Sequence, residues 1–235
     1  MHAAVLLPRF QMQAIEREAA QLVRQFHAAP IRQQAHAATK LVEFCSRQPH
    51  GREWQDAGGR AGVVAALAQA AKSSDAALQH EAVGVLGKLA LRHTENKSAA
   101  AAAGVVPHLV QLTKSSNAVH HQQAVFALGS LVTDHHDNQS AAAAAGAIPH
   151  LTQLTKSSIV TLQQQAVGAL GWLVCKRRDH QTAAAAAGSV HHIVKLTKSS
   201  DFTLQVLATA ALSQLVSNHH DNQSALQLRQ GRYRI

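Results

Sequence analysis

The chain contains one sequence unit that recurs with a fixed period of 42 residues. Lys-Ser-Ser stands at 72–74, 114–116, 156–158 and 198–200, and other motifs keep the same register. Self-similarity at a period of this size is typical of stacked supersecondary units, each of which contacts mainly its neighbours. The spacing therefore predicts a repeat array, in which function depends on surfaces that recur from one unit to the next.

The pattern within one unit predicts three helices. Asn96 precedes a serine and an alanine run that ends at Gly104, as expected for a short helix with a polar N-cap and a glycine stop. Pro107 then opens a second helix. A Thr-Lys-Ser-Ser turn follows, and we expect its second serine to cap the third helix. That third helix has the strongest amphipathic pattern, with core positions at Ala124, Leu128 and Leu131 and at their equivalents in the other units.

The register also divides the chain into segments. Residues 1–53 contain two more polar helical stretches, which we expect to form an N-terminal cap over the first repeat. Four repeats follow, at 54–95, 96–137, 138–179 and 180–221. Residues 222–235 begin another first helix and end in a basic tail, so we expect a truncated repeat there.

Several stretches resemble armadillo repeats, over about residues 54–224. They include Ala-Gly-Val-Val-Pro-His-Leu-Val-Gln-Leu at 103–112, its counterpart at 145–154, and Gln-Gln-Ala-Val-Phe-Ala-Leu-Gly-Ser-Leu at 122–131. The resemblance implies an all-α, right-handed α-solenoid whose third helices line a concave groove for a protein partner. HEAT repeats fit less well, because their units usually have two helices and lack the Gly-x-Ile-Pro entry to the second.

The peptide-binding members of the family repeat a tryptophan and, four residues later, an asparagine along the groove. The tryptophan position here holds Gly84, Phe126, Gly168 and Ala210, and the asparagine position holds Lys88, Ser130, Trp172 and Gln214. Since no repeat has both residues, we do not expect the chain to recognise basic signals as nuclear import adaptors do.

Phe126 and Trp172 are the best candidates for partner anchors, because aromatic residues are rare in this chain and both fall on the expected groove face. Packing within the protein is the alternative role for each of them. The other expected groove residues are Lys88, Ser130, Gln214, Gln122 and Gln164. This set lacks the acidic side chains that attract a basic peptide, which favours a neutral or acidic protein or peptide partner.

Histidines also follow the register, with His93, His135 and His219 spaced in steps of the repeat and Arg177 at the remaining position. We expect these residues to lie on a solvated edge, where equivalent side chains of neighbouring repeats are about 10 Å apart. That spacing is too wide for one zinc ion, so no metal site and no cofactor are expected. Because no nucleophile, base and acid stand at a defining spacing, we expect a protein that is not an enzyme.

The net charge of +9 gives a second hypothesis, which is binding to nucleic acid or another anionic surface. The charge is spread along the chain, however, and the dense clusters are Lys176-Arg177-Arg178 and the tail with Arg229, Arg232 and Arg234. A further alternative is that the chain is part of a larger armadillo scaffold, of the ubiquitin-ligase or vacuole-associated type.

The expected location is the cytoplasm, the nucleus or both. The two cysteines, Cys45 and Cys175, are far apart and suggest no disulfide framework, which fits a reducing compartment. No apolar run reaches the length of about 18 residues that a membrane span needs.

Overall fold

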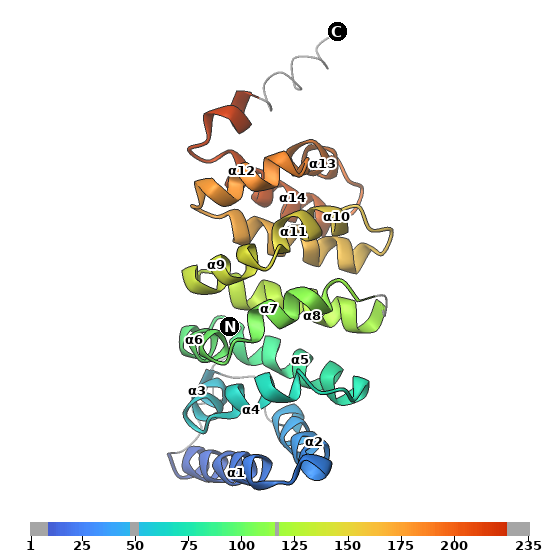
Figure 1. Ribbon diagram of the computed structural model, residues 1–235. Coiled ribbons are helices and arrows are strands. Elements are labelled where there is room, and N and C mark those ends of the chain that lie inside the picture. The colour runs from blue at the N-terminus through green and yellow to red at the C-terminus, as the bar shows by residue number, and fades with distance from the viewer. Residues whose placement is uncertain (1–8, 48–51, 116–117, 225–235) are drawn as a thin grey trace. The chain divides into compact units, whose positions relative to one another are not determined.

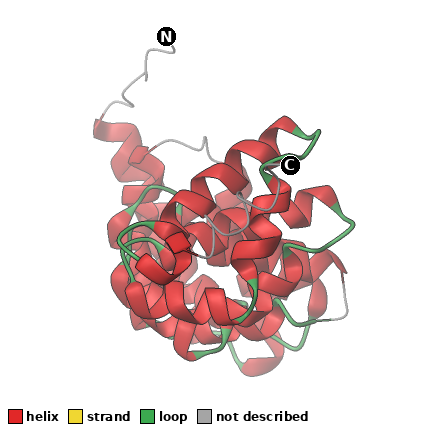
Figure 2. Cartoon of the chain, turned by 90° about the horizontal axis from the view of Figure 1, so that it is seen from above, coloured by secondary structure: helices red, strands yellow, loops and turns green. Residues whose placement is uncertain are grey.

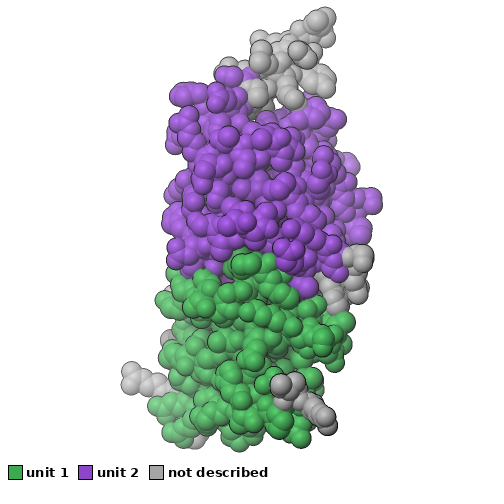
Figure 3. Space-filling view, in the orientation of Figure 1, with its two compact units in different colours: residues 1–109 green, residues 110–235 purple. Residues whose placement is uncertain are grey.

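The computed structural model describes residues 9–47, 52–115 and 118–224, which form helices and no strand (Figures 1 and 2). The chain divides into two compact units, residues 1–109 and 110–235, with the boundary inside α7 (Val105–Leu112) (Figure 3). Among the described helices, none combines the length and the apolar character that crossing a membrane requires.

The first unit begins with a pair of helices that pack on the first repeat. The pair is α1 (Arg9–Ala28) and α2 (Ile31–Arg47), and Phe26 and Phe44 are its largest buried side chains. The repeat consists of α3 (Arg52–Arg60), α4 (Val63–Ala70) and α5 (Ala76–Ala90), and α6 (Thr94–Ala102) follows it. Helix α1 packs on α3 and α4, and α2 packs on α4 and α5. Helices α1 and α2 therefore form one packed layer with α3, α4 and α5.

The second unit is built around three long helices that lie in sequence order. They are α8 (Ala118–Val132), α11 (Val160–Val174) and α14 (Phe202–Val216), and α11 packs against both of the others. In the sequence, the long helices are separated by the shorter helices α9 (His136–Ala144), α10 (Ala147–Leu154), α12 (Arg178–Ala186) and α13 (Ser189–Leu196). Residues 220–224 are again helical.

The predicted core of the third helices is confirmed. Ala124, Leu128 and Leu131 of α8 are fully buried, as are Ala166, Leu170 and Leu173 of α11. On α14, Ala208 and Leu215 are also buried, whereas Leu212 is half-buried. The glycine stops are confirmed as well, because Gly104, Gly146 and Gly188 have φ values of 61°, 82° and 83°. These left-handed conformations end one helix and begin the next.

The prediction that asparagines such as Asn96 and Asn138 cap the first helices is wrong, because the cap of these helices is the histidine three residues earlier. The Nδ1 atom of His93 accepts the Asn96 backbone N–H at 3.2 Å, and His135 and His219 do the same for Asn138 and Asn222 at 3.3 Å. The asparagine lies inside the helix and is buried. Its Nδ2 atom donates to the end of the preceding third helix, as Asn96 does to the Leu89 carbonyl at 2.9 Å.

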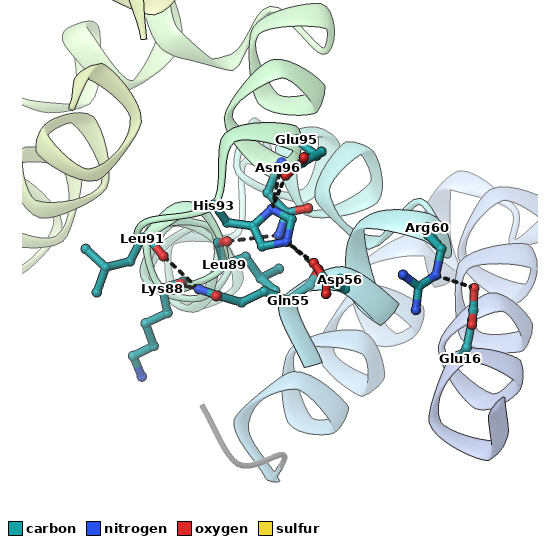
Figure 4. A network of polar contacts seen from close by, with 10 residues as sticks. All are labelled: Glu16, Gln55, Asp56, Arg60, Lys88, Leu89, Leu91, His93, Glu95 and Asn96. Carbon is teal, nitrogen blue, oxygen red and sulfur yellow. Dashed lines mark hydrogen bonds and ion pairs between the residues drawn. The ribbon is translucent and has the colours of Figure 1, made fainter. Parts of the chain in front are cut away.

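The capping histidines are buried, so the prediction of a solvated edge for them is also wrong. His93, His135 and His219 are 3%, 8% and 3% exposed. Figure 4 shows His93 between Asn96 and Asp56, with its Nε2 atom in contact with the carboxylate of Asp56 on α3. His219 reaches Thr182 Oγ1 of α12 in the same way, at 2.9 Å. The ring therefore caps one first helix and joins it to the preceding one.

The Lys-Ser-Ser turn uses its first serine rather than its second. The Oγ atoms of Ser73, Ser157 and Ser199 each accept the backbone N–H two residues later, at 3.1 Å. The N-cap of α5, α11 and α14 is the residue after the pair, and in α5 and α14 it is an aspartate whose carboxylate accepts helical N–H groups. Ser116 lies outside the described residues. The serines therefore shape the turn, while aspartate caps the helix where it is present.

The second helices are joined by a further set of histidines. Nε2 of His108 bonds to the Ala71 carbonyl at 2.8 Å, Nε2 of His150 to the Thr113 carbonyl at 2.6 Å and Nε2 of His192 to the Thr155 carbonyl at 2.8 Å. A carbonyl oxygen only accepts, so this nitrogen carries the hydrogen in each ring. On α8, the ring of His121 stacks on His150 with centroids 6.0 Å apart.

We expect acidification to destabilise the second unit through His121. Burial lowers the pKa of His121, and the neighbouring His150 lowers it further. The folded state therefore favours the neutral ring, so its contribution to stability is complete above the unfolded pKa of about 6.5 and is lost as the pH falls below it. Urea denaturation at pH 7.5 and 5.5 checks this expectation, and the loss of stability should be smaller in His121→Gln. Equal losses in the two proteins would contradict it.

Candidate functional site

The candidate binding face lies on α8, α11 and α14 of the second unit, which carry Phe126, Ser130, Trp172, Gln122, Gln164 and Gln214. None of these three helices contains Asp, Glu, Lys or Arg. We call these six residues the third-helix face. Their side chains are aromatic, amide and hydroxyl groups.

Glycines allow the third helices to approach closely. A Cβ atom placed on Gly129 lies 3.4 Å from the Ala169 Cβ, and one placed on Gly171 lies 3.2 Å from both the Cα and the Cβ of Ala211. The second contact is with backbone, so a side chain at 171 requires α11 and α14 to move apart. The two glycines stand at the same repeat position and determine the spacing of the face.

Two of the predicted groove amides join neighbouring helices. Gln122 Nε2 donates to Thr161 Oγ1 at 3.2 Å, across α8 and α11. Gln164 Nε2 donates to Asp201 Oδ1 at 3.0 Å, across α11 and the start of α14. Both side chains are half-buried, so they help to fix the edge of the face where the third helices begin.

Trp172 is 40% exposed and stands beside an apolar pocket between α11 and α14. The pocket has a volume of about 140 Å³. Its lining consists of small and aliphatic residues with one amide, namely Val167, Gly168, Gly171, Trp172, Leu207, Ala210, Ala211 and Gln214. The structure thus places two of the predicted residues, Trp172 and Gln214, at one pocket.

The other aromatic candidate lies in a different environment. Phe126 is half-buried, and its carbonyl accepts the hydroxyl of Ser130 at 3.0 Å. Ser130 itself is only 5% exposed. Of the two aromatic candidates, Trp172 is therefore the more accessible to a partner.

Lys88 belongs to the first unit, at the corresponding position of α5. Its side chain is exposed, and Figure 4 shows that it points away from the polar network around His93. Its carbonyl takes part in that network, because Gln55 Nε2 donates to the carbonyls of Lys88 and Leu91 at 3.0 and 2.9 Å.

Glutamines at the position of Gln55 hold the ends of the third helices, a role that the sequence analysis missed. Gln139 Nε2 donates to the Trp172 carbonyl at 3.0 Å, and Gln181 Nε2 donates to the Gln214 carbonyl at 2.6 Å. Both glutamines are 2% exposed. The sequence signal was present, because Gln55, Gln139 and Gln181 follow the repeat register. These contacts fix the backbone under Trp172 and Gln214.

The basic cluster at 176–178 is divided among different roles. Lys176 is exposed and has a positive φ of 56° in the turn after α11. The guanidinium of Arg177 contacts Asp179 at 3.4 Å and Ser140 Oγ at 3.1 Å, and its hydrogen bond is the main cause of the lowered pKa of Asp179. Arg178 is exposed at the start of α12. The arginines of the tail lie outside the described residues.

Within the described part of the chain, no three His, Cys, Asp or Glu side chains come together as metal ligands would. Cys45 and Cys175 are free, and burial raises the pKa of Cys45 to about 12. A thiol with so high a pKa is protonated at neutral pH and is a poor nucleophile.

Comparison with known proteins identifies the repeat. Residues 135–173 match the armadillo/beta-catenin-like repeat family, and no curated protein sequence matches the chain. An engineered protein of known crystal structure is 28% identical, with a TM-score of 0.77 over 90% of this chain and 85% of that one.

Two designed armadillo repeat proteins have the same fold. One, computationally designed for modular peptide recognition, is 20% identical with a TM-score of 0.76, over 89% of this chain and 87% of that one. The other, solved in complex with the peptide (KR)4, is 18% identical with a TM-score of 0.69, over 89% of this chain and 95% of that one. The chain therefore has the fold of armadillo repeat solenoids.

Proposed function

We propose that this armadillo-repeat protein is a non-catalytic scaffold that binds a segment of a partner protein on its third-helix face. The observation that carries the proposal is Trp172, a large aromatic side chain that stays 40% exposed beside an apolar pocket. Tryptophan is enriched among the few residues that contribute most of the binding energy of protein interfaces. The designed armadillo proteins of similar fold, one made for peptide recognition and one bound to a peptide, support the same kind of function.

We further propose that the partner segment is neutral or acidic. The (KR)4 peptide in the designed complex is strongly basic. The third helices of the second unit contain no carboxylate that could pair with lysine or arginine side chains of such a peptide. The exposed charges of Lys176 and Arg178, near the end of α11, favour an acidic residue over a basic one.

Binding to an anionic surface is the second candidate function. The exposed lysines of the Lys-Ser-Ser turns, Lys114, Lys156 and Lys198, favour it. In the first unit, however, the equivalent Lys72 donates to the Ala103 carbonyl at 3.3 Å, at the C-terminal end of α6, which gives that lysine a structural role. Affinity for nucleic acid should fall steeply with salt, whereas binding to an uncharged face should not.

We propose the cytoplasm or the nucleus as the place of action. This proposal is supported by Cys45 and Cys175, which form no disulfide, as is usual for proteins of a reducing compartment.

The double variant Phe126→Ala/Trp172→Ala tests the proposed function. We expect it to lose partners that the wild-type protein captures, because both aromatic side chains lie on the proposed face. Phe202→Ala is the matched control, since Phe202 is 76% exposed on α14 and does not line the pocket. The measurement is a quantitative comparison of captured proteins by mass spectrometry. Identical partner lists for the wild type and the double variant would contradict binding on this face.

A further inference from the structure

We infer that the pocket beside Trp172 is the anchor subsite of the third-helix face. It takes one apolar side chain, between leucine and phenylalanine in size, from an uncharged stretch of the partner. This inference rests on the proposed function and specifies what the partner segment must contain.

The size of the occupant follows from the volume of the pocket and from the preceding repeat. An apolar cavity of about 150 Å³ holds one benzene molecule, and this pocket measures about 140 Å³. Gly168, which lines the pocket, stands at the repeat position that Phe126 occupies on α8. A glycine on α11 thus leaves open a place that carries a phenyl group one repeat earlier. A side chain of the partner can fill that place.

The apolar character of the occupant follows from the lining. Gln214 is the one lining residue with a polar side chain, and the remaining contacts come from aliphatic, small and indole groups. Burying an ionised group there would remove its water without providing a counter-charge, which is strongly unfavourable. Because α8, α11 and α14 carry no formal charge, the residues next to the anchor should also be uncharged.

The pocket is also held in place before any partner binds. The Gln139 side chain fixes the Trp172 carbonyl, and the Gln181 side chain fixes the Gln214 carbonyl. Gly171 keeps α14 close to α11 at the pocket floor. A subsite that needs little ordering retains more of its contact energy as affinity.

Gly168→Leu provides a direct test, because it fills the pocket from within. A Cβ atom at residue 168 lies 3.7 Å from Leu207 Cδ2, which is ordinary van der Waals contact, so a side chain can start from this position without a clash. The probe is a displayed library of short random peptides selected on the wild-type protein. The affinity of the most enriched peptides is then measured by fluorescence anisotropy for the wild type, Gly168→Leu, Trp172→Ala, Phe126→Ala and the control Phe202→Ala.

We expect the enriched peptides to share one apolar residue flanked by uncharged ones. Gly168→Leu and Trp172→Ala should each weaken their binding by about tenfold or more, while Phe202→Ala changes it by less than about twofold. A peptide in which alanine replaces the shared apolar residue should bind the wild-type protein as weakly as the unaltered peptide binds Gly168→Leu. The thermal midpoint of Gly168→Leu should be no lower than that of the wild type, which excludes unfolding as the cause of the loss.

Two results would overturn the inference, and they differ in what they imply for the proposed function. If the peptides bind Gly168→Leu as tightly as the wild type but lose affinity in Phe126→Ala, the face binds partners without using the pocket. If the library yields no binder, or only acidic peptides whose affinity depends on Lys114, Lys156 and Lys198, both the pocket and the proposed face are wrong.

Discussion

Gly171→Leu is expected to lower the free energy of unfolding by about 3 kcal/mol, at the upper end of the usual range for overpacking a core. A Cβ at this position lies 3.2 Å from both the Cα and the Cβ of Ala211, so α11 and α14 must move apart to admit any side chain there. The obstacle is the backbone of α14, which cannot turn aside as a flexible side chain would. Chemical denaturation monitored by circular dichroism measures the change.

Gly168→Leu is the matched control for this prediction, because the same substitution is made three residues earlier in the same helix. Its new side chain enters the pocket, and leucine has a better helix propensity than glycine by about 0.5–1 kcal/mol. We therefore expect this variant to be as stable as the wild type or more stable. Similar losses of stability in the two variants would contradict the close approach of α11 and α14 at Gly171.

Asn96→Ala is expected to lower the free energy of unfolding by about 2–4 kcal/mol. Asn96 is fully buried, and its Nδ2 atom donates to the Gln55 carbonyl at 3.0 Å and to the Leu89 carbonyl at 2.9 Å (Figure 4). Alanine removes both hydrogen bonds, of which the one to Leu89 is buried and the one to Gln55 partly buried, and a buried carbonyl left without a partner costs about 1–3 kcal/mol. Urea denaturation of the full chain measures the loss.

Ser98→Ala is the control on the same helix. The hydroxyl of Ser98 donates to the Thr94 carbonyl at 3.1 Å on the exposed side of α6, and surface substitutions of this kind usually change stability by no more than about 0.5 kcal/mol. If Asn96→Ala behaved like Ser98→Ala, the buried amide would not be needed to join α6 to the helices before it.

The helices and their core could be predicted from the sequence because the signals are local and are repeated in register. An alanine run that ends at Gly146, a proline at 149 and apolar residues at 166, 170 and 173 each predict a helix boundary or a buried face. The structure confirms these features, with Gly146 in the left-handed conformation and all three apolar residues fully buried.

The caps of the first helices could not be predicted in the same way. His93 and Asn96 are both polar and stand three residues apart, so either can serve as the residue that accepts the first free N–H groups. Which one does so depends on where the helix begins, and the propensity scale favours asparagine. The structure begins α6 at Thr94, which directs the histidine ring inward and buries the asparagine.

The candidate site could be predicted in part. The repeat register places Phe126 and Trp172 on third helices, but the exposure of each ring depends on the neighbouring helix. The pocket arises from a missing side chain at Gly168 and from the short distance between α11 and α14. Distances between helices depend on contacts far apart in the sequence, so the pocket becomes visible only in the folded protein.

Amide chemical-shift mapping with an enriched library peptide is the decisive test of binding on the third-helix face, because it reports where on the chain a partner segment binds. We expect the largest changes along α11 and α14, at Gly168, Trp172, Ala210 and Gln214 and in the indole N–H of Trp172. Changes confined to the first helices, or to the turns at Lys114, Lys156 and Lys198, would contradict it.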